Sequence, residues 1–156
     1  MTDARPPDRV VLRIERTFNA PAQAVFDAWT STEVLGRWWP AGPDWDTPVV
    51  QVDVRVGGRL RLVMRRPDGQ EFGGSGEYLE ITPPERLVFT WTWDGQEEQE
   101  GLQLVEVDFK EEQDGTTTVA LTNSGLRDEG SKRSHEEGWQ ASFDNLDAIF
   151  RELTPE

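Results

Sequence analysis

The chain of 156 residues contains no cysteine, one histidine and one tyrosine. Without cysteine it can form neither a disulfide nor a thiolate metal site, and it has no cysteine nucleophile. The single histidine, His135, has no second histidine with which to share a zinc or iron ion. We therefore expect no metal and no other cofactor. His135 follows a polar stretch, so we expect it to be a solvated side chain in the first turn of a helix.

Basic residues are also scarce, with 16 lysines and arginines against 30 aspartates and glutamates. The net charge of −14 and the pI near 4.4 repel phosphate backbones and anionic lipid. We therefore expect neither a nucleic-acid partner nor a membrane partner. No apolar run approaches the ~18 residues of a membrane span, and the first residues lack a signal-peptide pattern. A cytoplasmic location is the expectation.

Short alternating segments separated by turn residues fill the middle of the chain. Asp68-Gly69, Asp94-Gly95 and Asp114-Gly115 are strong turn signals, and each falls between two apolar-alternating runs. Consecutive strands joined by short turns indicate an antiparallel meander. The pattern predicts strands at residues 10–18, 49–56, 59–66, 70–81, 86–93, 102–111 and 116–123.

Two short helices are expected between the first two strands. Asn19 offers an N-cap and Pro21 fits the first helical turn. Thr30, with Glu33 three residues later, has the spacing of a capping box for a second helix, which Pro40 ends.

A long amphipathic helix is predicted at residues 134–153. Its apolar residues recur at steps of three and four, and Ser134 with Glu137 has the spacing of a capping box. Such a helix needs a broad apolar partner, which the sheet supplies. The predicted fold class is therefore α+β, with helices on one face of a curved antiparallel sheet of about seven strands. Residues 1–9 are predicted to be a flexible tail, and residues 10–153 a single domain.

Several stretches, in this order, resemble the activator of heat-shock-protein ATPase homologue family. They are Asn19-Ala20-Pro21, Val25-Phe26-Asp27-Ala28-Trp29-Thr30, Trp38-Trp39-Pro40, Val56-Gly57-Gly58-Arg59, Pro67-Asp68-Gly69, Pro83-Pro84-Glu85-Arg86-Leu87-Val88-Phe89-Thr90-Trp91, Gly115-Thr116-Thr117 and Gly138-Trp139. The resemblance covers residues 10–153. It implies the START-like (SRPBCC) helix-grip fold, in which a curved sheet wraps a long C-terminal helix around an apolar cavity.

Aromatic residues are the most informative side chains, with seven tryptophans and seven phenylalanines. Alternate positions of a strand share one face, so the inward faces of the sheet and the last helix should line the cavity. Trp38 and Trp39 point about 100° apart on a helix, so we expect one in the core and Trp39 at the cavity mouth. The predicted ligand-binding residues are Trp39, Met64, Tyr78, Phe89, Trp91, Trp93, Phe109, Trp139 and Phe143.

Glycines stand at two unusual places. Gly73-Gly74-Ser75-Gly76 lies within a predicted strand and lacks the spacing of a phosphate-binding loop, so it is expected to permit curvature or a bulge. Gly138 interrupts the predicted last helix, and a close approach to the sheet is the expected reason.

Three functions remain open. The first is a carrier or sensor that binds a small apolar or aromatic molecule in the cavity. The second, implied by the START-like resemblance, is a cyclase or aromatase, with Glu77 or Tyr78 as a buried polar group that moves protons. The third and least favoured is a co-chaperone that stimulates a chaperone ATPase. The sequence leaves the oligomeric state undetermined.

Overall fold

The computed structural model describes residues 10–40, 42, 44–96 and 101–153. Residues 1–9, the predicted tail, lie outside this range. The elements in chain order are β1 (Val10–Phe18), α1 (Ala22–Thr30), α2 (Thr32–Trp38), β2 (Asp46–Val52), β3 (Arg59–Arg65), β4 (Glu71–Thr82), β5 (Arg86–Trp93), β6 (Gln103–Glu111), β7 (Thr117–Leu126) and α3 (Glu129–Leu153).

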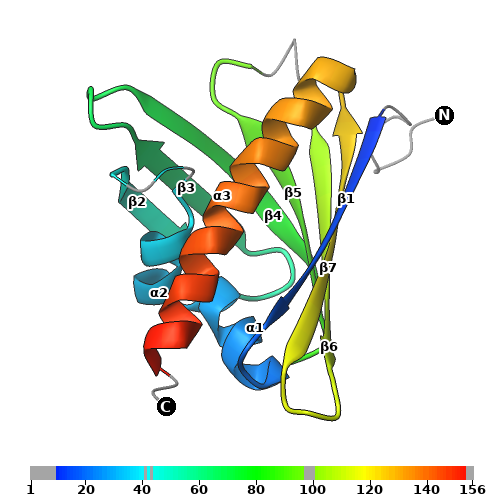
Figure 1. Cartoon of the computed structure of the whole chain (residues 1–156). Coiled ribbons are helices and arrows are strands. Elements are labelled where there is room, and N and C mark those ends of the chain that lie inside the picture. Colours follow the sequence, from blue (N-terminus) through cyan, green and yellow to red (C-terminus); the bar gives the residue numbers. More distant parts are fainter. Residues whose placement is uncertain (1–9, 41, 43, 97–100, 154–156) are drawn as a thin grey trace, which may run out of the picture.

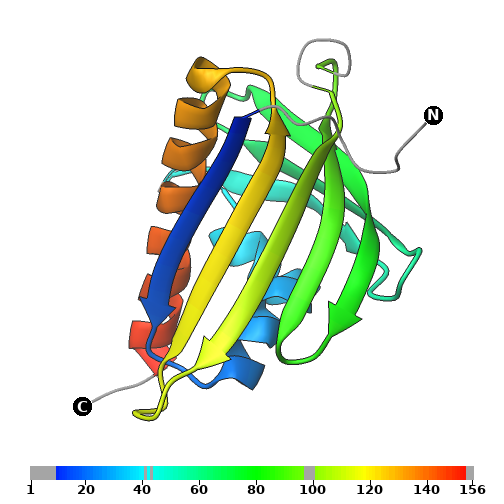
Figure 2. The same cartoon turned by 90° about the vertical axis from the view of Figure 1, so that its right-hand side faces the viewer.

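The seven strands form one antiparallel sheet in the order β1-β7-β6-β5-β4-β3-β2. The chain therefore winds as a meander from β2 to β7, and β1 closes the far edge beside β7. The sheet curves around α3, which crosses its inner face, while α1 and α2 lie at the end of the sheet near the C-terminus of α3 (Figures 1 and 2). This is the α+β helix-grip architecture expected from the sequence.

The C-terminal half of α3 is buried in a closely packed core. Phe143 and Phe18 meet edge to face with ring centroids 5.6 Å apart, and the Phe150 ring also packs on Phe18, at 6.1 Å. Leu146 and Ile149 are buried on the same helical face. Burying such side chains contributes roughly 1.5–3 kcal/mol each, so this half of α3 fixes the helix to the sheet.

The two short helices fill the same end of the sheet. From α1, Phe26 packs on Phe109 at 5.3 Å, and Trp29 contacts both Phe109 and Phe143 at 6.2 Å. From α2, the Trp38 ring lies 4.8 Å from the Trp29 ring, and its indole N–H donates to the Ala28 carbonyl at 2.8 Å. This end of the space between sheet and α3 is solidly packed.

The predicted strands are confirmed as elements, with shifted ends. The bounds of β1 and β5 are as predicted. β2 starts earlier and ends earlier than predicted, because residues 53–58 form a turn in which Arg55 and Gly58 bond back to Asp53 and Arg55. β7 continues to Leu126, three residues beyond the prediction, because Val10 of β1 pairs with it there.

The predicted start of the last helix was wrong. α3 begins at Glu129, and the Asp128 carboxylate accepts the backbone N–H of Ser131 at 2.8 Å. This hydrogen bond lowers the pKa of Asp128. It also caps the helix more than one turn before Ser134. Ser134 and Glu137 therefore lie within the helix and do not form its capping box.

The predicted caps of the short helices were also wrong. The N-cap of α1 is Pro21 instead of Asn19, and the free N–H of Ala22 donates to the Glu111 carboxylate at 2.9 Å, a partner far away in the sequence. The N-cap of α2 is Ser31, whose hydroxyl accepts the N–H of Val34. Thr30 instead bonds back to the carbonyl of Phe26 within α1.

The glycines of β4 serve close packing. A Cβ atom on Gly76 would lie 1.7 Å from the carbonyl oxygen of Thr90, and one on Gly74 would lie 2.4 Å from the ring of Trp91. The β4 irregularity lies elsewhere, between Tyr78 and Glu80. The expected close approach at Gly138 is absent, because a Cβ there would meet nothing within 4 Å.

We predict opposite effects for two glycine-to-alanine changes. Gly76→Ala forces a methyl group into the backbone of β5 and should lower the free energy of unfolding by about 3 kcal/mol or more. Gly138→Ala meets open space in a helix and should raise it by about 0.5–1 kcal/mol. Urea unfolding of both variants measures the two values. Equal effects of the two changes would contradict the described packing.

Candidate functional site

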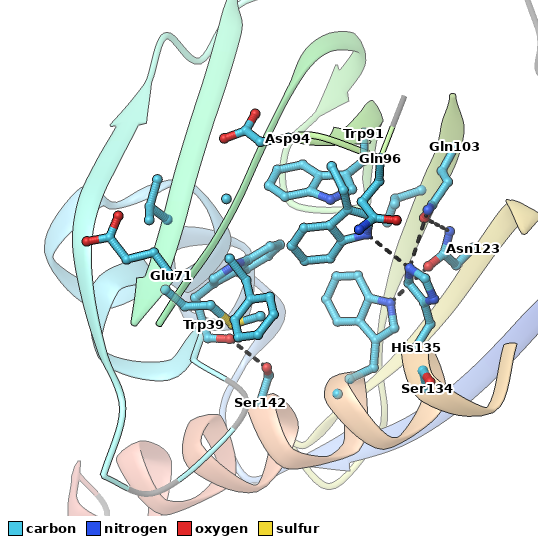
Figure 3. Close-up of a pocket in the computed structure, with 18 of the residues that line it drawn as sticks. Trp39, Glu71, Trp91, Asp94, Gln96, Gln103, Asn123, Ser134, His135 and Ser142 are labelled. Atoms are coloured by element: carbon cyan, nitrogen blue, oxygen red, sulfur yellow. Dashed lines mark hydrogen bonds between the residues drawn. The ribbon is translucent and has the colours of Figure 1, made fainter. Parts of the chain in front are cut away.

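A pocket of about 860 Å³ lies between the sheet and the N-terminal half of α3. Its walls come from β3, β4, β5, β6, β7, α3 and the end of α2 (Figure 3). It lies beside the packed end of the inner space, and α1 and α2 border it: Trp29 of α1 stacks on the lining residue Trp139 at 5.8 Å, and Trp39 at the end of α2 is part of the lining. The volume lies within the range of small-molecule sites, roughly 300–1,000 Å³.

One face of α3 forms the floor of this pocket. Ser134, His135, Gly138, Trp139 and Ser142 all line it. They recur at steps of one, three and four residues, which is a single stripe of a helix. The Ser142 hydroxyl donates to the Trp39 carbonyl at 2.7 Å, which fixes α3 to the end of α2 (Figure 3). The helix thus changes from pocket lining to core packing at Phe143.

Four tryptophans form a continuous aromatic wall. The Trp39 ring lies 5.5 Å from both the Trp91 and Trp139 rings, and the Trp91 ring lies 5.3 Å from the Trp93 ring. A fifth, Trp45, stacks on Phe72 at 5.8 Å elsewhere in the pocket lining. Large rigid rings in mutual contact hold their positions at low entropic cost, so the wall is preorganised.

A chain of hydrogen bonds joins the two ends of this aromatic wall. Trp93 Nε1 donates to His135 Nε2 at 3.1 Å, and Trp139 Nε1 donates to Asn123 Oδ1 at 3.1 Å. Between them, Asn123 Nδ2 donates to Gln103 Oε1 at 3.1 Å, and Gln103 Nε2 lies 3.3 Å from His135 Nε2 (Figure 3). Together with the aromatic wall, these contacts form a closed loop of residues within the pocket lining.

The direction of every bond in this chain is fixed from its two ends. An indole N–H can only donate, so Trp93 requires an acceptor at His135 Nε2 and Trp139 requires the oxygen of Asn123. The amides of Asn123 and Gln103 must then be oriented as described. His135 Nδ1 donates to the Ser131 carbonyl at 2.8 Å, which completes a neutral imidazole with one hydrogen. His135 is therefore a structural member of the pocket, and the expectation of a solvated side chain was wrong.

Charged groups stand at the other side of the pocket. Arg61 donates two parallel hydrogen bonds to Asp94, Nη1 to Oδ1 at 3.1 Å and Nη2 to Oδ2 at 2.7 Å. The hydrogen bond to Asp94 raises the pKa of Arg61, against a smaller opposing effect of burial. Figure 3 places Asp94 and Glu71 opposite His135, Gln103 and Asn123. Within the described ranges, no group of three or more histidine, aspartate or glutamate side chains could hold a metal ion.

Six of the nine residues predicted to bind a ligand line the pocket: Trp39, Met64, Phe89, Trp91, Trp93 and Trp139. Trp39 lies there while Trp38 is in the core, as expected. The other three do not line it. Phe109 and Phe143 are covered by Phe26 and Trp29 of α1, and Tyr78 is buried beside Phe89, with ring centroids 6.2 Å apart.

The sequence interpretation missed Gln103 and Asn123, which with His135 form the polar corner of the pocket. Gln103 precedes Val105, Val107 and Phe109 at alternate positions of β6, and Asn123 follows Leu121 on β7, so both had to face inward. Each is 1% exposed. A polar residue in register with an apolar inner face was the available signal. Trp45 and Phe72 gave no periodic signal.

The fold and this cavity define a helix-grip domain with an aromatic pocket. The model of the activator of Hsp90 ATPase homolog 1-like protein family matches residues 19–151. The chain belongs to this family. No curated protein sequence matches it.

Solved structures share the whole fold. The AHSA1 protein from Silicibacter pomeroyi is 30% identical, with a TM-score of 0.78 and coverage of 93% of this chain and 100% of that one. The AHSA1-like protein from Aeromonas hydrophila is 28% identical, with a TM-score of 0.76 and coverage of 92% and 94%. Protein CV1439 from Chromobacterium violaceum is 24% identical, with a TM-score of 0.82 and coverage of 94% and 98%, and shows the fold. No described helix is long and apolar enough to span a membrane.

We predict that Asn123→Leu destabilises the protein by roughly 2–4 kcal/mol, because it leaves Trp139 Nε1 and Gln103 Oε1 without their partners. In a Trp139→Phe background the same change should cost less, since the indole N–H is already gone. A double-mutant cycle from urea unfolding measures the difference. Strict additivity would show that the two side chains are not coupled.

We also predict a loss of stability at alkaline pH that depends on the single tyrosine. Burial, with a smaller effect of Asp53, raises the pKa of Tyr78 from 10.0 to about 12. Above pH 10 the unfolded chain releases this proton while the folded protein retains it. The free energy of unfolding should therefore fall as pH rises from 10 towards 12, by on the order of 2 kcal/mol.

Tyr78→Phe is the matched control, because it keeps the buried ring and removes the proton. Its unfolding free energy should lose this part of the pH dependence. The ultraviolet absorbance of the phenolate reports the titration of the folded protein directly, since no other tyrosine contributes. A midpoint near the ordinary tyrosine value would contradict the prediction.

Proposed function

We propose that this protein is a carrier or sensor that binds a small apolar or aromatic molecule in the pocket between the sheet and α3. The observation that supports this most strongly is the aromatic wall of Trp39, Trp91, Trp93 and Trp139 around a volume of about 860 Å³. Burial of apolar ligand surface against such walls gives a favourable free energy of about 25 cal/mol per Å² before the cost of association.

The hydrogen-bonded corner supports the same proposal. Trp93 and Trp139 are each held by a directed bond to His135 and Asn123, so the pocket keeps its shape without a guest. A preformed pocket binds more tightly than one that must open, because less conformational freedom is lost on binding.

An enzymatic role has less support from the described residues. Glu77 and Tyr78, the polar groups expected to serve a cyclase or aromatase, do not line the pocket. Among the described side chains that do line it, the ionisable ones are Arg61, Glu71, Asp94 and His135. Both ring nitrogens of His135 already have partners. Nothing in the described residues favours stimulation of a chaperone ATPase.

We predict that Gly138→Phe blocks ligand binding. Gly138 lines the pocket and open space lies beyond its Cβ position, so a phenyl ring there would occupy the volume of a guest. Titration with the neutral dye Nile red should give saturable tryptophan quenching at one site in the natural protein and roughly tenfold weaker binding in the variant. Native mass spectrometry of gently purified protein would identify any co-purified guest.

Ala148→Phe is the control, because it adds the same ring to an exposed position of the same helix. It should bind the dye like the natural protein. Equal binding by both phenylalanine variants would place the dye elsewhere and contradict the proposed site. Absence of saturable binding across a broad panel of lipids and aromatic compounds would contradict the proposed function itself.

A further inference from the structure

The charge of the pocket lining indicates which kind of ligand it accepts. Indole faces carry negative electrostatic potential, and a cation near such a face is attracted by roughly 0.5–2 kcal/mol. The pocket is lined by seven aromatic rings, of which Trp39, Phe89 and Trp91 are buried behind the surface. Trp45, Phe72, Trp93 and Trp139 are half-buried and are the rings that a guest would contact.

Among the described residues of the lining, the one arginine is already paired with a carboxylate. Arg61 is held by Asp94 through two bonds of 3.1 and 2.7 Å, the planar geometry in which arginine normally grips a carboxylate ligand. An anionic guest would have to displace Asp94 to obtain this contact. Glu71, also in the lining, lies 3.9 Å from Arg65, whose closest carboxylate is Asp46 at 2.6 Å.

The opposite corner supplies no positive charge. His135 is neutral in its hydrogen-bonded arrangement, because a second ring proton would face the donors of Trp93 and Gln103. Asn123 and Gln103 are neutral amides. The described lining therefore carries two carboxylates against one guanidinium, on a chain whose net charge is −14.

We infer that the pocket selects an organic cation: a molecule with an aromatic or apolar body and a positive charge, such as a substituted ammonium. The inference depends on the proposed function, and narrows it. The acidic surface raises the concentration of cations near the pocket, and the aromatic wall binds the body and the charge together. A carboxylate or phosphate head group would have to compete with Asp94 for the bidentate face of Arg61.

Tetraphenylphosphonium and tetraphenylborate test the inference, because they share size and shape and differ in the sign of their charge. Binding is measured by tryptophan fluorescence and calorimetry at one fixed ionic strength. The cation should bind at least roughly tenfold more tightly than the anion. Equal binding, tighter binding of the anion, or no binding of the cation would each overturn the inference.

Two variants should shift this preference in opposite directions. Asp94→Asn leaves the charge of Arg61 uncompensated, so the ratio of cation to anion affinity should fall roughly fivefold or more. Arg61→Gln leaves Asp94 uncompensated, so the ratio should rise by a similar factor. The same ratio of cation to anion affinity in all variants would show that Arg61 and Asp94 do not set the selectivity, and would overturn the inference.

Matched controls separate a local effect from a change in net charge. Asp108→Asn removes a carboxylate that accepts two hydrogen bonds from Arg86, and Arg37→Gln removes an exposed arginine paired with Glu152; none of these residues lines the pocket. Both controls should keep the natural ratio. Nile red is neutral and separates the two proposals. If Gly138→Phe weakens Nile red binding while the cation and the anion bind equally, the proposed binding function stands and the inferred charge selectivity is wrong.

Discussion

The hydrogen-bonded chain from Trp93 through His135, Gln103 and Asn123 to Trp139 is the constraint on which the pocket depends. Apolar walls attract one another, and a hollow between a sheet and a helix tends to close unless its walls are held. Here the two ends of the aromatic wall are tied to the sheet and to α3 by bonds with fixed direction. In this direction the oxygen and the nitrogen of the Asn123 and Gln103 amides each have a partner, and a flipped amide would place donor against donor, so the corner resists rearrangement.

The pocket is stable because the other half of the domain is solid. α3 carries two different surfaces: a stripe of small and polar residues with Trp139 in its first half, and Phe143, Leu146, Ile149 and Phe150 in its second. The second half packs against Phe18 and against the side chains of α1 and α2. Core burial there fixes the position of the helix, and its first half can border empty space without loss of the fold.

Sequence patterns predicted the sheet and the helices well because those depend on local periodicity. The alternation of Leu87, Phe89, Trp91 and Trp93 marks one face of β5 whatever surrounds it. Helix ends were less predictable. Ala22 is capped by Glu111, almost ninety positions later in the chain, and no local pattern reveals such a partner. The capping-box pattern at Ser134 was misleading because Asp128 had already started the helix.

The same limit explains which site residues were predicted. An inward-facing aromatic residue can line a cavity or fill a core, and local sequence does not separate the two. Phe109 and Phe143 fill the core because Phe26 and Trp29 of α1 pack on them, whereas the ring contacts of Phe89 and Trp91 are with Tyr78, Trp39 and Trp93, and both line the pocket. Gln103 and Asn123 were detectable in principle, since a polar residue in register with an apolar face must find partners inside.

Arginines on the surface pair with neighbouring carboxylates, as Arg61 does at the pocket. Carboxylates outnumber basic groups almost two to one, so an arginine on this protein readily finds an acidic neighbour. Arg65 is bonded to Asp46, Arg86 contacts Glu80, Glu106 and Asp108, and Arg61 is bonded to Asp94. Exposed pairs of this kind stabilise the fold little. These pairs affect binding more than stability. In so acidic a chain an arginine usually has a carboxylate partner already. A pocket that bound an anion through an arginine would need to keep carboxylates away from that arginine.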